Sequence, residues 1–367
     1  MWKSVLLLIV VQTLLLLLHL PGGSSWCCLV RPRLEIPSGR TTAVVRPPSK
    51  LGGRLIRHMS LSPADAINLD EMWPHLVGKN TCATDAAGKV IREAWARELG
   101  QTADAAPGRR WGIRREVVEY KDGEITLQGL YARPTGEGVP DRIPGVVLAH
   151  TAVGPQEDFI LWKLDAIARL GYAAFALDMF GTGRALWDRS ESLAARRPIT
   201  EDRSLMQARA NAALQTLKTL EGVDPERLAA VGYCFGGMAV LDLARMGPVA
   251  TPGLKAVASL HGILVPVSPG CRGGVAVEDA KIGPRVVVLH ASDDPFVPPE
   301  QVQAMEQEFI RRGANLEIVT YGGGARHAFT RPEKTGQADR DAGLSYDGHA
   351  DVDSWRRVVD LLREEFS

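Results

Sequence analysis

The residue with the clearest chemical potential in this sequence is Cys234. Residues 228–233 (Leu-Ala-Ala-Val-Gly-Tyr) form a short apolar run, and Cys234 separates them from Phe-Gly-Gly and an apolar helical pattern. Gly232 and Gly236 permit a sharp strand-to-helix turn at which larger side chains would collide. Such a turn holds a nucleophile at a helix N-terminus, where the helix dipole favours a thiolate. Taken alone, the pattern also fits a buried structural cysteine beside a tight turn.

An acid and a base follow this cysteine along the chain. Asp293 and Asp294 come directly after an apolar run at 285–290, and His327 lies in a glycine-rich loop after a run at 316–321. Nucleophile, acid and base occur in this order in α/β-hydrolase triads. In a triad the imidazole takes the proton of the nucleophile and later protonates the leaving group, while the carboxylate orients the ring. The order therefore predicts a thiol hydrolase with one of the two aspartates as the acid.

The elements that must position these groups alternate from Arg114 onward. The sequence predicts a hairpin, then strands that alternate with helices of ten or more residues. This pattern is typical of a doubly wound, mostly parallel α/β sheet with helices on both faces and the ligand site at the carboxyl ends of the strands. Residues 187–200 form either a cap or a solvated loop. The expected strands are 116–120, 125–131, 145–150, 173–177, 228–233, 256–261, 285–290 and 316–321, and the expected helices are 158–170, 203–220, 299–312 and 351–366.

These motifs resemble the dienelactone hydrolase family. The likeness rests on Gly-Tyr-Cys-Phe-Gly-Gly at 232–237, Asp-Pro-Phe-Val-Pro at 294–298 and His-Ala-Phe at 327–329, and it extends over about 117–366. The resemblance implies an α/β-hydrolase fold in which Cys234 is the nucleophile and His327 the base. It also implies that Asp294 is the acid, because Asp294 stands three residues before Val-Pro as the family's acid does.

Further roles are expected around the triad. The backbone N–H groups of Phe235 and Ala152 would form the oxyanion hole. Arg331 matches a family arginine that holds a substrate carboxylate, which implies a preference for acidic esters or lactones, and Arg184 lies near the place of a second such arginine. An alternative partner for Arg331 is Glu333. The departures from the family are that Arg184 is displaced, and that Thr151 stands where the family has a glutamate, with Glu157 and Asp158 further along.

Composition excludes several classes of function. The chain has 43 basic and 43 acidic residues, so nothing in its net charge favours nucleic acid. Its five cysteines form no C-x-x-C pair. His150, His261 and His290 each end an expected strand, but no two share metal-ligand spacing on one element. We therefore expect neither a metal nor a cofactor.

The N-terminal part differs in character from the rest. Lys3 precedes an apolar run from Val5 to Leu18 and small residues, which indicates a secretory signal over residues 1–25, with an uncleaved membrane anchor as the alternative. Residues 26–60 are basic and almost free of acids, like a transit segment or a disordered pro-region. We expect entry into the secretory pathway, then either secretion or delivery to a plastid through a bipartite leader. Residues 61–112 read as an N-terminal extension and linker, and residues 113–367 as the hydrolase domain.

The function expected from these observations is hydrolysis of carboxylic esters or lactones through an acyl-thioenzyme. The partner would be a small-molecule ester or lactone, and the sequence indicates no oligomeric state. Three alternatives stay open. One is a hydrolase for thioesters or small peptides, and another is a non-catalytic binding protein. The third is a redox sensor that uses Cys234.

Overall fold

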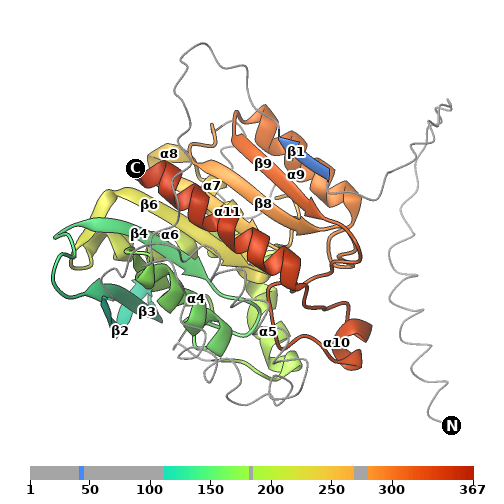
Figure 1. Cartoon of the computed structure of the whole chain (residues 1–367), viewed down its shortest axis with the longest axis horizontal. Helices are drawn as coiled ribbons and strands as arrows, with labels where there is room; N and C mark the ends of the chain where they lie inside the picture. Colours follow the sequence, from blue (N-terminus) through green and yellow to red (C-terminus); the bar gives the residue numbers. More distant parts are fainter. Residues whose placement is uncertain (1–40, 45–110, 182–184, 268–279) are drawn as a thin grey trace, which may run out of the picture. The chain divides into compact units, whose positions relative to one another are not determined.

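The computed structural model of the chain describes residues 41–44, 111–181, 185–267 and 280–367 (Figure 1). Its centre is an open nine-stranded sheet in the order β1-β9-β8-β7-β6-β4-β5-β3-β2. Neighbouring strands from β5 to β9 in this order run parallel. The strands are β1 (Thr41–Val44), β2 (Gly112–Asp122), β3 (Ile125–Thr135), β4 (Ile143–Ala149), β5 (Ala173–Ala176), β6 (Val223–Tyr233), β7 (Leu254–Leu260), β8 (Arg285–Ala291) and β9 (Asn315–Tyr321).

Both edges of the sheet are antiparallel. β2 and β3 form a hairpin around Gly123, whose φ of 57° a glycine adopts without strain, and β3 pairs antiparallel with β5. On the opposite edge, β1 pairs antiparallel with β9 over residues 41–44. The parallel centre is buried on both faces; β4, for example, is buried along its whole length. A strand buried on both faces is apolar throughout, as the sequence of β4 is.

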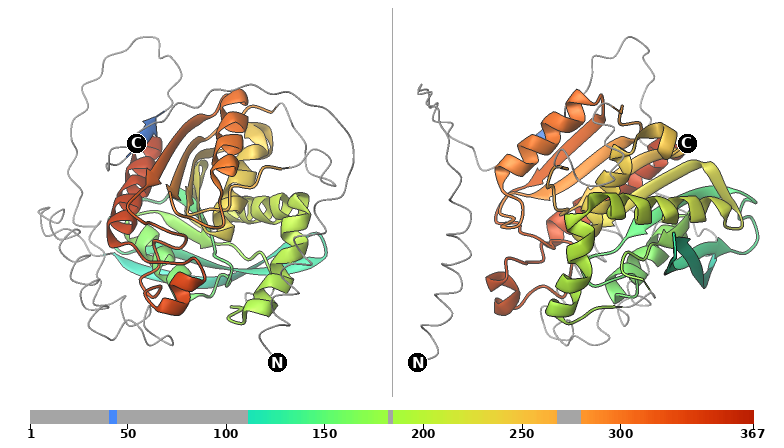
Figure 2. Two further views of the ribbon diagram at one scale, coloured as in Figure 1. Left: turned by 90° about the vertical axis from the view of Figure 1, so that its right-hand side faces the viewer. Right: turned by 180° about the vertical axis from the view of Figure 1, so that it is seen from behind.

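Helices cover the two faces of the sheet. α4 (Asp158–Arg169) and α11 (Gly348–Phe366) pack on one face, and α6 (Arg203–Thr219), α7 (Phe235–Arg245) and α9 (Pro299–Arg311) pack on the other (Figures 1 and 2). Each face therefore has its own apolar core, and the sheet separates the two cores. The remaining helices are α5 (Arg189–Glu201), α8 (Gly247–Ala250) and α10 (Gln337–Asp341).

The fold predicted from the sequence is confirmed: a mostly parallel α/β sheet with helices on both faces. Residues 187–200, expected to be a cap or a solvated loop, contain all of α5 except its last residue, Glu201. The expected signal segment at 1–25 lies outside the described residues. Of the basic segment at 26–60 only residues 41–44 are described, and they form β1; of the extension at 61–112 only the last two residues, 111–112, are described.

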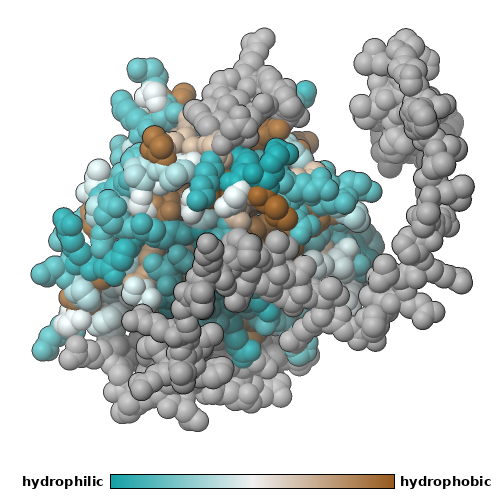
Figure 3. All heavy atoms as spheres, turned by 90° about the horizontal axis from the view of Figure 1, so that it is seen from above, coloured by the Kyte–Doolittle hydropathy of each residue, from teal (hydrophilic) through white to brown (hydrophobic). Residues whose placement is uncertain are grey.

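One face of the described part is mainly polar. Figure 3 shows one face on which hydrophilic side chains predominate and apolar ones are scattered. None of the helices in the described ranges has the length and apolar character that a membrane span needs.

A buried ionic network fixes α7, the helix that follows Cys234. Arg203 of α6 binds both carboxylate oxygens of Asp242 at 2.6 Å, and Arg245 also donates to Asp242, at 2.8 Å. Arg245 binds Glu308 of α9 at 2.8 Å as well. All of these side chains are buried except Glu308, which is partly so. The network therefore joins the three helices of one face through α7.

Removing the shared carboxylate should destabilise the fold strongly. Asp242→Ala leaves two buried guanidinium groups without their common partner, and we expect the free energy of unfolding to fall by about 3–5 kcal/mol. Urea denaturation measures this change. Glu201→Ala, which breaks the exposed Arg197–Glu201 pair, is the control and should leave the unfolding midpoint unchanged. Similar midpoints for the two variants would show that the network does not hold α7 in place.

Candidate active site

Cys234 lies on a strained corner between β6 and α7. Its φ of 56° and ψ of −116° place a non-glycine residue in a region that L side chains rarely adopt. The two neighbouring glycines make the corner possible. A Cβ on Gly232 would lie 2.2 Å from the carbonyl oxygen of Gly236, and a Cβ on Gly236 would lie 2.2 Å from that of Ala149. The backbone therefore closes around the turn, and the thiol projects at the carboxyl end of β6.

An acid and a base meet beside this turn. The Asp294 carboxylate accepts the Nδ1 hydrogen of His327 at 2.7 Å, and it also accepts the N–H of Phe296 at 2.9 Å. Both His327 and Asp294 are buried. Asp293 is exposed instead and accepts a hydrogen bond from Ser292 at 3.1 Å. Of the two aspartates that the sequence offered, the structure brings Asp294 to the imidazole.

The charges of the thiol and the imidazole stabilise each other. Burial by itself raises the pKa of the Cys234 thiol, but the charge of His327, a hydrogen bond with His327 and the N–H of Phe235 together outweigh it, so this pKa is lowered. Burial likewise opposes a charged His327. The Cys234 thiolate and Asp294 overcome that cost and raise the pKa of His327. The arrangement therefore favours a thiolate–imidazolium pair.

His261 supports the base and was assigned no role from the sequence. Its ring packs edge-on against that of His327 with centroids 5.2 Å apart, and its Nε2 bonds the Thr330 hydroxyl at 2.8 Å. The ring of Phe296 packs against His327 as well, with centroids 5.0 Å apart. Burial, and then the charge of His327, hold the pKa of His261 well below its ordinary value. A neutral ring therefore flanks the base. In the sequence, the signal for His261 is its position at the end of the expected strand 256–261.

The loop after β4 carries Ala152, whose N–H is expected from the sequence to complete an oxyanion hole. In the described part of the chain the N–H of Ala152 donates to no backbone acceptor, and its carbonyl accepts the Ser192 hydroxyl at 2.5 Å. His150 braces this loop, because its Nδ1 bonds the Thr151 carbonyl at 2.6 Å and its Nε2 accepts the N–H of Met179 at 3.2 Å. Burial lowers the pKa of His150 to about 4, so the ring is neutral at physiological pH.

Arg331 is bound by protein side chains. It forms ion pairs with Glu157, through Nη2, and with Glu333, through Nε at 2.5 Å, while Nη1 donates to the Thr151 hydroxyl at 3.4 Å. The family resemblance predicts that this fork holds a substrate carboxylate, with Glu333 as the alternative partner. In the structure each guanidinium nitrogen already has a protein acceptor.

Glu157 completes this cluster. It is buried, and it accepts the Thr151 hydroxyl at 2.5 Å. Burial raises the pKa of its carboxyl, although Arg331 and Thr151 both oppose the shift. Where the family has a glutamate, this chain thus has Thr151, which is hydrogen-bonded to Glu157, and both residues bind Arg331. Arg184, the other expected substrate-binding residue, lies outside the described residues.

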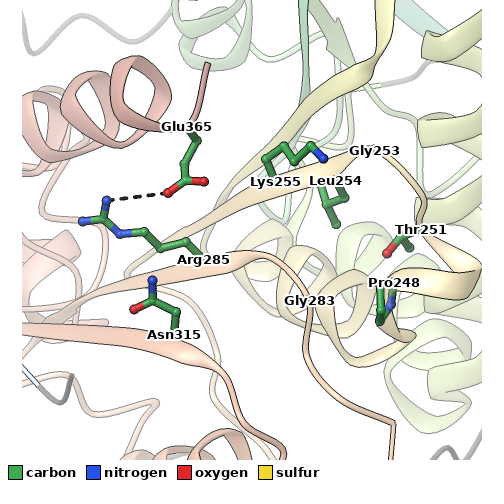
Figure 4. A pocket seen from close by; sticks show the side chains of 9 residues that line it. All are labelled: Pro248, Thr251, Gly253, Leu254, Lys255, Gly283, Arg285, Asn315 and Glu365. Atoms are coloured by element: carbon green, nitrogen blue, oxygen red, sulfur yellow. Dashed lines mark ion pairs between the residues drawn. The ribbon is translucent and has the colours of Figure 1, made fainter. Parts of the chain in front are cut away.

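A separate hollow of about 320 Å³ lies at the amino ends of the parallel strands. Its walls include the first residues of three strands, Leu254, Arg285 and Asn315 (Figure 4). Arg285 pairs there with Glu365 at 3.8 Å. Cys234, Asp294 and His327 follow the carboxyl ends of their strands, so this hollow lies at the other ends of the strands from them. Among the described residues, no group of three or more His, Cys, Asp or Glu side chains is arranged to hold a metal ion.

Comparisons with known proteins show the family to which the chain is similar. The family model described as the dienelactone hydrolase family matches residues 127–366. A solved dienelactone hydrolase-like promiscuous phosphotriesterase from metagenomic libraries is similar at 32% identity and a TM-score of 0.61, over 70% of this chain and 99% of that one. An uncharacterised Caenorhabditis elegans protein is 34% identical over 46% of this chain and all of its own length. A Synechocystis protein provisionally named carboxymethylenebutenolidase is 24% identical over 69% of this chain and 98% of its own.

The pH dependence of alkylation should report the lowered thiol pKa. The thiolate forms as pH rises through this pKa, so the iodoacetamide reaction of Cys234 should reach half its maximal rate below about pH 8.5, the ordinary value for a thiol. His327→Gln removes the main lowering interaction and should shift the midpoint upward. Mass spectrometry of the Cys234 peptide follows the reaction, with Cys82 and Cys271 as internal references. An unshifted midpoint in His327→Gln would show that the imidazole does not stabilise the thiolate.

The Arg331–Glu157 pair should be strongly coupled in stability. Arg331→Gln leaves a buried carboxylate without its cation, and the expected loss in the free energy of unfolding is about 3–5 kcal/mol. In Glu157→Gln/Arg331→Gln the loss should be well below the sum of the single variants, because neither charge is left unpaired. Urea denaturation of all four proteins gives the coupling. Additive losses would mean that the two side chains do not depend on each other.

Proposed function

The chain belongs to the dienelactone hydrolase family, and on that premise we propose that it hydrolyses carboxylic esters or lactones through an acyl-thioenzyme formed on Cys234. Its membership makes it a hydrolase acting on ester or lactone bonds. The observation that supports the covalent route best is the 2.7 Å bond between Asp294 and His327 beside the Cys234 turn.

The first half-reaction transfers the acyl group to the thiol. The Cys234 thiolate attacks the carbonyl carbon, and the carbonyl electron pair moves to oxygen. The resulting oxyanion is stabilised by the N–H groups of Phe235 and Ala152. When the intermediate collapses, the C–O bond to the leaving group breaks, and His327 protonates the alkoxide from Nε2, the ring nitrogen that Asp294 leaves available.

The second half-reaction restores the thiol. His327, now neutral, takes a proton from a water molecule as that water attacks the thioester carbonyl. Collapse of this intermediate breaks the C–S bond and releases the carboxylic acid, and the thiolate–imidazolium pair re-forms. Asp294 holds the imidazole in the tautomer that both half-reactions require and stabilises its cationic form.

The hydrogen bond between Asp294 and His327 beside Cys234 favours acyl transfer over the alternatives. A redox sensor needs an accessible thiolate and a resolving thiol, but it has no use for a carboxylate that fixes the tautomer of an imidazole. A binding protein has no use for a strained corner that exposes a thiol beside a base. Thioesters and small peptides meet the same machinery, so a substrate panel separates them from oxygen esters.

Neutralising the acid should reduce turnover far more than neutralising its neighbour. Asp294→Asn is expected to lower kcat by roughly 10⁴-fold, since it disrupts the tautomer of His327, whereas the exposed Asp293→Asn should change it little. The assay is hydrolysis of p-nitrophenyl esters, lactones and a thioester by wild type and by both variants. Cys234→Ala should abolish all of these activities. Equal losses for the two aspartate variants would remove Asp294 from the mechanism.

A further inference from the structure

His150 is a buried side chain beside the loop that carries Ala152. It is the first residue after β4, and its backbone lies against the nucleophile turn, since a Cβ on Gly236 would lie 2.6 Å from the His150 carbonyl oxygen. Its ring packs against that of Phe180, with centroids 4.8 Å apart, and against that of Phe235, the residue after the nucleophile, at 6.1 Å. Backbone and ring of His150 therefore both lie beside the expected oxyanion hole.

The hydrogen bonds of the His150 ring require one tautomer. A backbone carbonyl can only accept, so Nδ1, which lies 2.6 Å from the Thr151 carbonyl oxygen, carries the hydrogen. A backbone N–H can only donate, so Nε2, which lies 3.2 Å from the Met179 nitrogen, is the acceptor. Burial lowers the pKa of His150 to about 4, so this neutral form persists at physiological pH. One ring thus links the loop after β4 to the turn after β5.

The carbonyl that His150 binds belongs to the peptide group whose N–H comes from Ala152. This peptide is trans, so its C=O and N–H point in opposite directions. A donor that fixes the Thr151 carbonyl therefore also fixes the direction of the Ala152 N–H. The same hydrogen bond polarises the peptide group, which makes its N–H a stronger donor.

Neighbouring polar groups of this loop are occupied. The Ala152 carbonyl accepts the Ser192 hydroxyl at 2.5 Å. Val153 accepts the N–H of Leu186 at 2.7 Å through its carbonyl, and it donates its own N–H to the Thr151 hydroxyl at 3.2 Å. The N–H of Ala152, by contrast, has no backbone acceptor in the described ranges. A donor that is held in a fixed direction and left open is what an oxyanion hole needs before the reaction begins.

We propose that His150 is a positioning residue of the oxyanion hole: it aims the Ala152 N–H at the reacting carbonyl and strengthens it as a donor. The inference rests on the proposed function, in which this N–H stabilises the oxyanion, and adds to it the side chain that prepares the donor. His150 acts through the peptide group and exchanges no proton with the substrate. Because the N–H meets a full negative charge only in the tetrahedral intermediate, weakening it should lower kcat more than it changes KM.

The test compares two reactions of the same thiol. Alkylation by iodoacetamide needs the Cys234 thiolate but forms no oxyanion, whereas hydrolysis of p-nitrophenyl acetate needs both. We measure kcat and KM for this ester and the alkylation rate of the Cys234 peptide in wild type and in His150 variants. His150→Phe keeps a ring and loses both nitrogens, while His150→Asn places an amide near the position of Nδ1 and keeps a donor for the Thr151 carbonyl.

Two further variants complete the set. His150→Gln has a longer side chain that reaches Met179 and leaves the Thr151 carbonyl without its donor, so it takes the place of His150→Phe if that variant does not fold. Tyr120→Phe is the matched control. The Tyr120 hydroxyl donates to the Asp178 carbonyl at 3.2 Å and accepts the Asp178 N–H at 2.9 Å, so its loss disturbs the turn after β5 but not the peptide that His150 binds.

His150→Phe and His150→Gln should lower kcat by about tenfold to a hundredfold with little change in KM, a smaller loss than the roughly 10²–10³-fold caused by removing an oxyanion donor. Their alkylation rates should stay at the wild-type value. His150→Asn should recover part of kcat, and Tyr120→Phe should leave it unchanged. The proposal is overturned if the Phe and Gln variants keep the wild-type kcat, if alkylation falls as far as kcat, or if Tyr120→Phe lowers kcat equally. Failure of the proposed function is distinct, because it would show as ester hydrolysis that survives Cys234→Ala.

Discussion

The structure depends on how closely backbone segments approach one another at the turn that carries Cys234. A Cβ on Gly232 would lie 2.2 Å from the carbonyl oxygen of Gly236, and a Cβ on Gly236 would lie 2.2 Å from that of Ala149. Therefore β4, β6 and α7 leave no room for a side chain at either glycine. This contact sets the strained φ of Cys234 and thereby the direction of the thiol. It also brings the loop after β4 beside the turn. The buried ionic network around Asp242 then holds α7 against the neighbouring helices.

Around this corner, burial makes every charge depend on a partner. Burial alone would keep the Cys234 thiol and the His327 ring neutral, yet each lies close enough to the other for the pKa of the thiol to fall and that of the imidazole to rise. Glu157 and Arg331 form a second such pair, supported by Thr151. His150 and His261 behave in the opposite way: burial is the main cause that lowers their pKa values, with the charge of His327 next for His261, and they serve as neutral supports.

The parts of this arrangement that short-range patterns encode were predictable from the sequence. Apolar runs and glycine spacing predicted the strands and the Cys234 turn, because parallel strands and tight turns restrict residue types locally. The partner of Arg331 was not predictable: Glu157, Glu333 and Thr151 come together only when α4 and the loop after β9 are folded. Residues 187–200 are rich in arginine and serine, which fits a cap as well as a solvated loop, and only the structure shows the helix α5 there. The pairing of Arg331 with its three partners depends on the tertiary fold, so local sequence patterns do not show it.

The central claim is that Cys234 becomes covalently acylated, and rapid acid quench of wild type with a p-nitrophenyl ester tests it directly. A thioester survives acid, so peptide mass spectrometry of the quenched protein should find the mass of the acyl group on the peptide containing Cys234. The modification should appear within the first turnover and vanish when the ester is exhausted. Efficient hydrolysis with no acyl group on Cys234 at any quench time, or with the acyl group on another residue, would contradict the account.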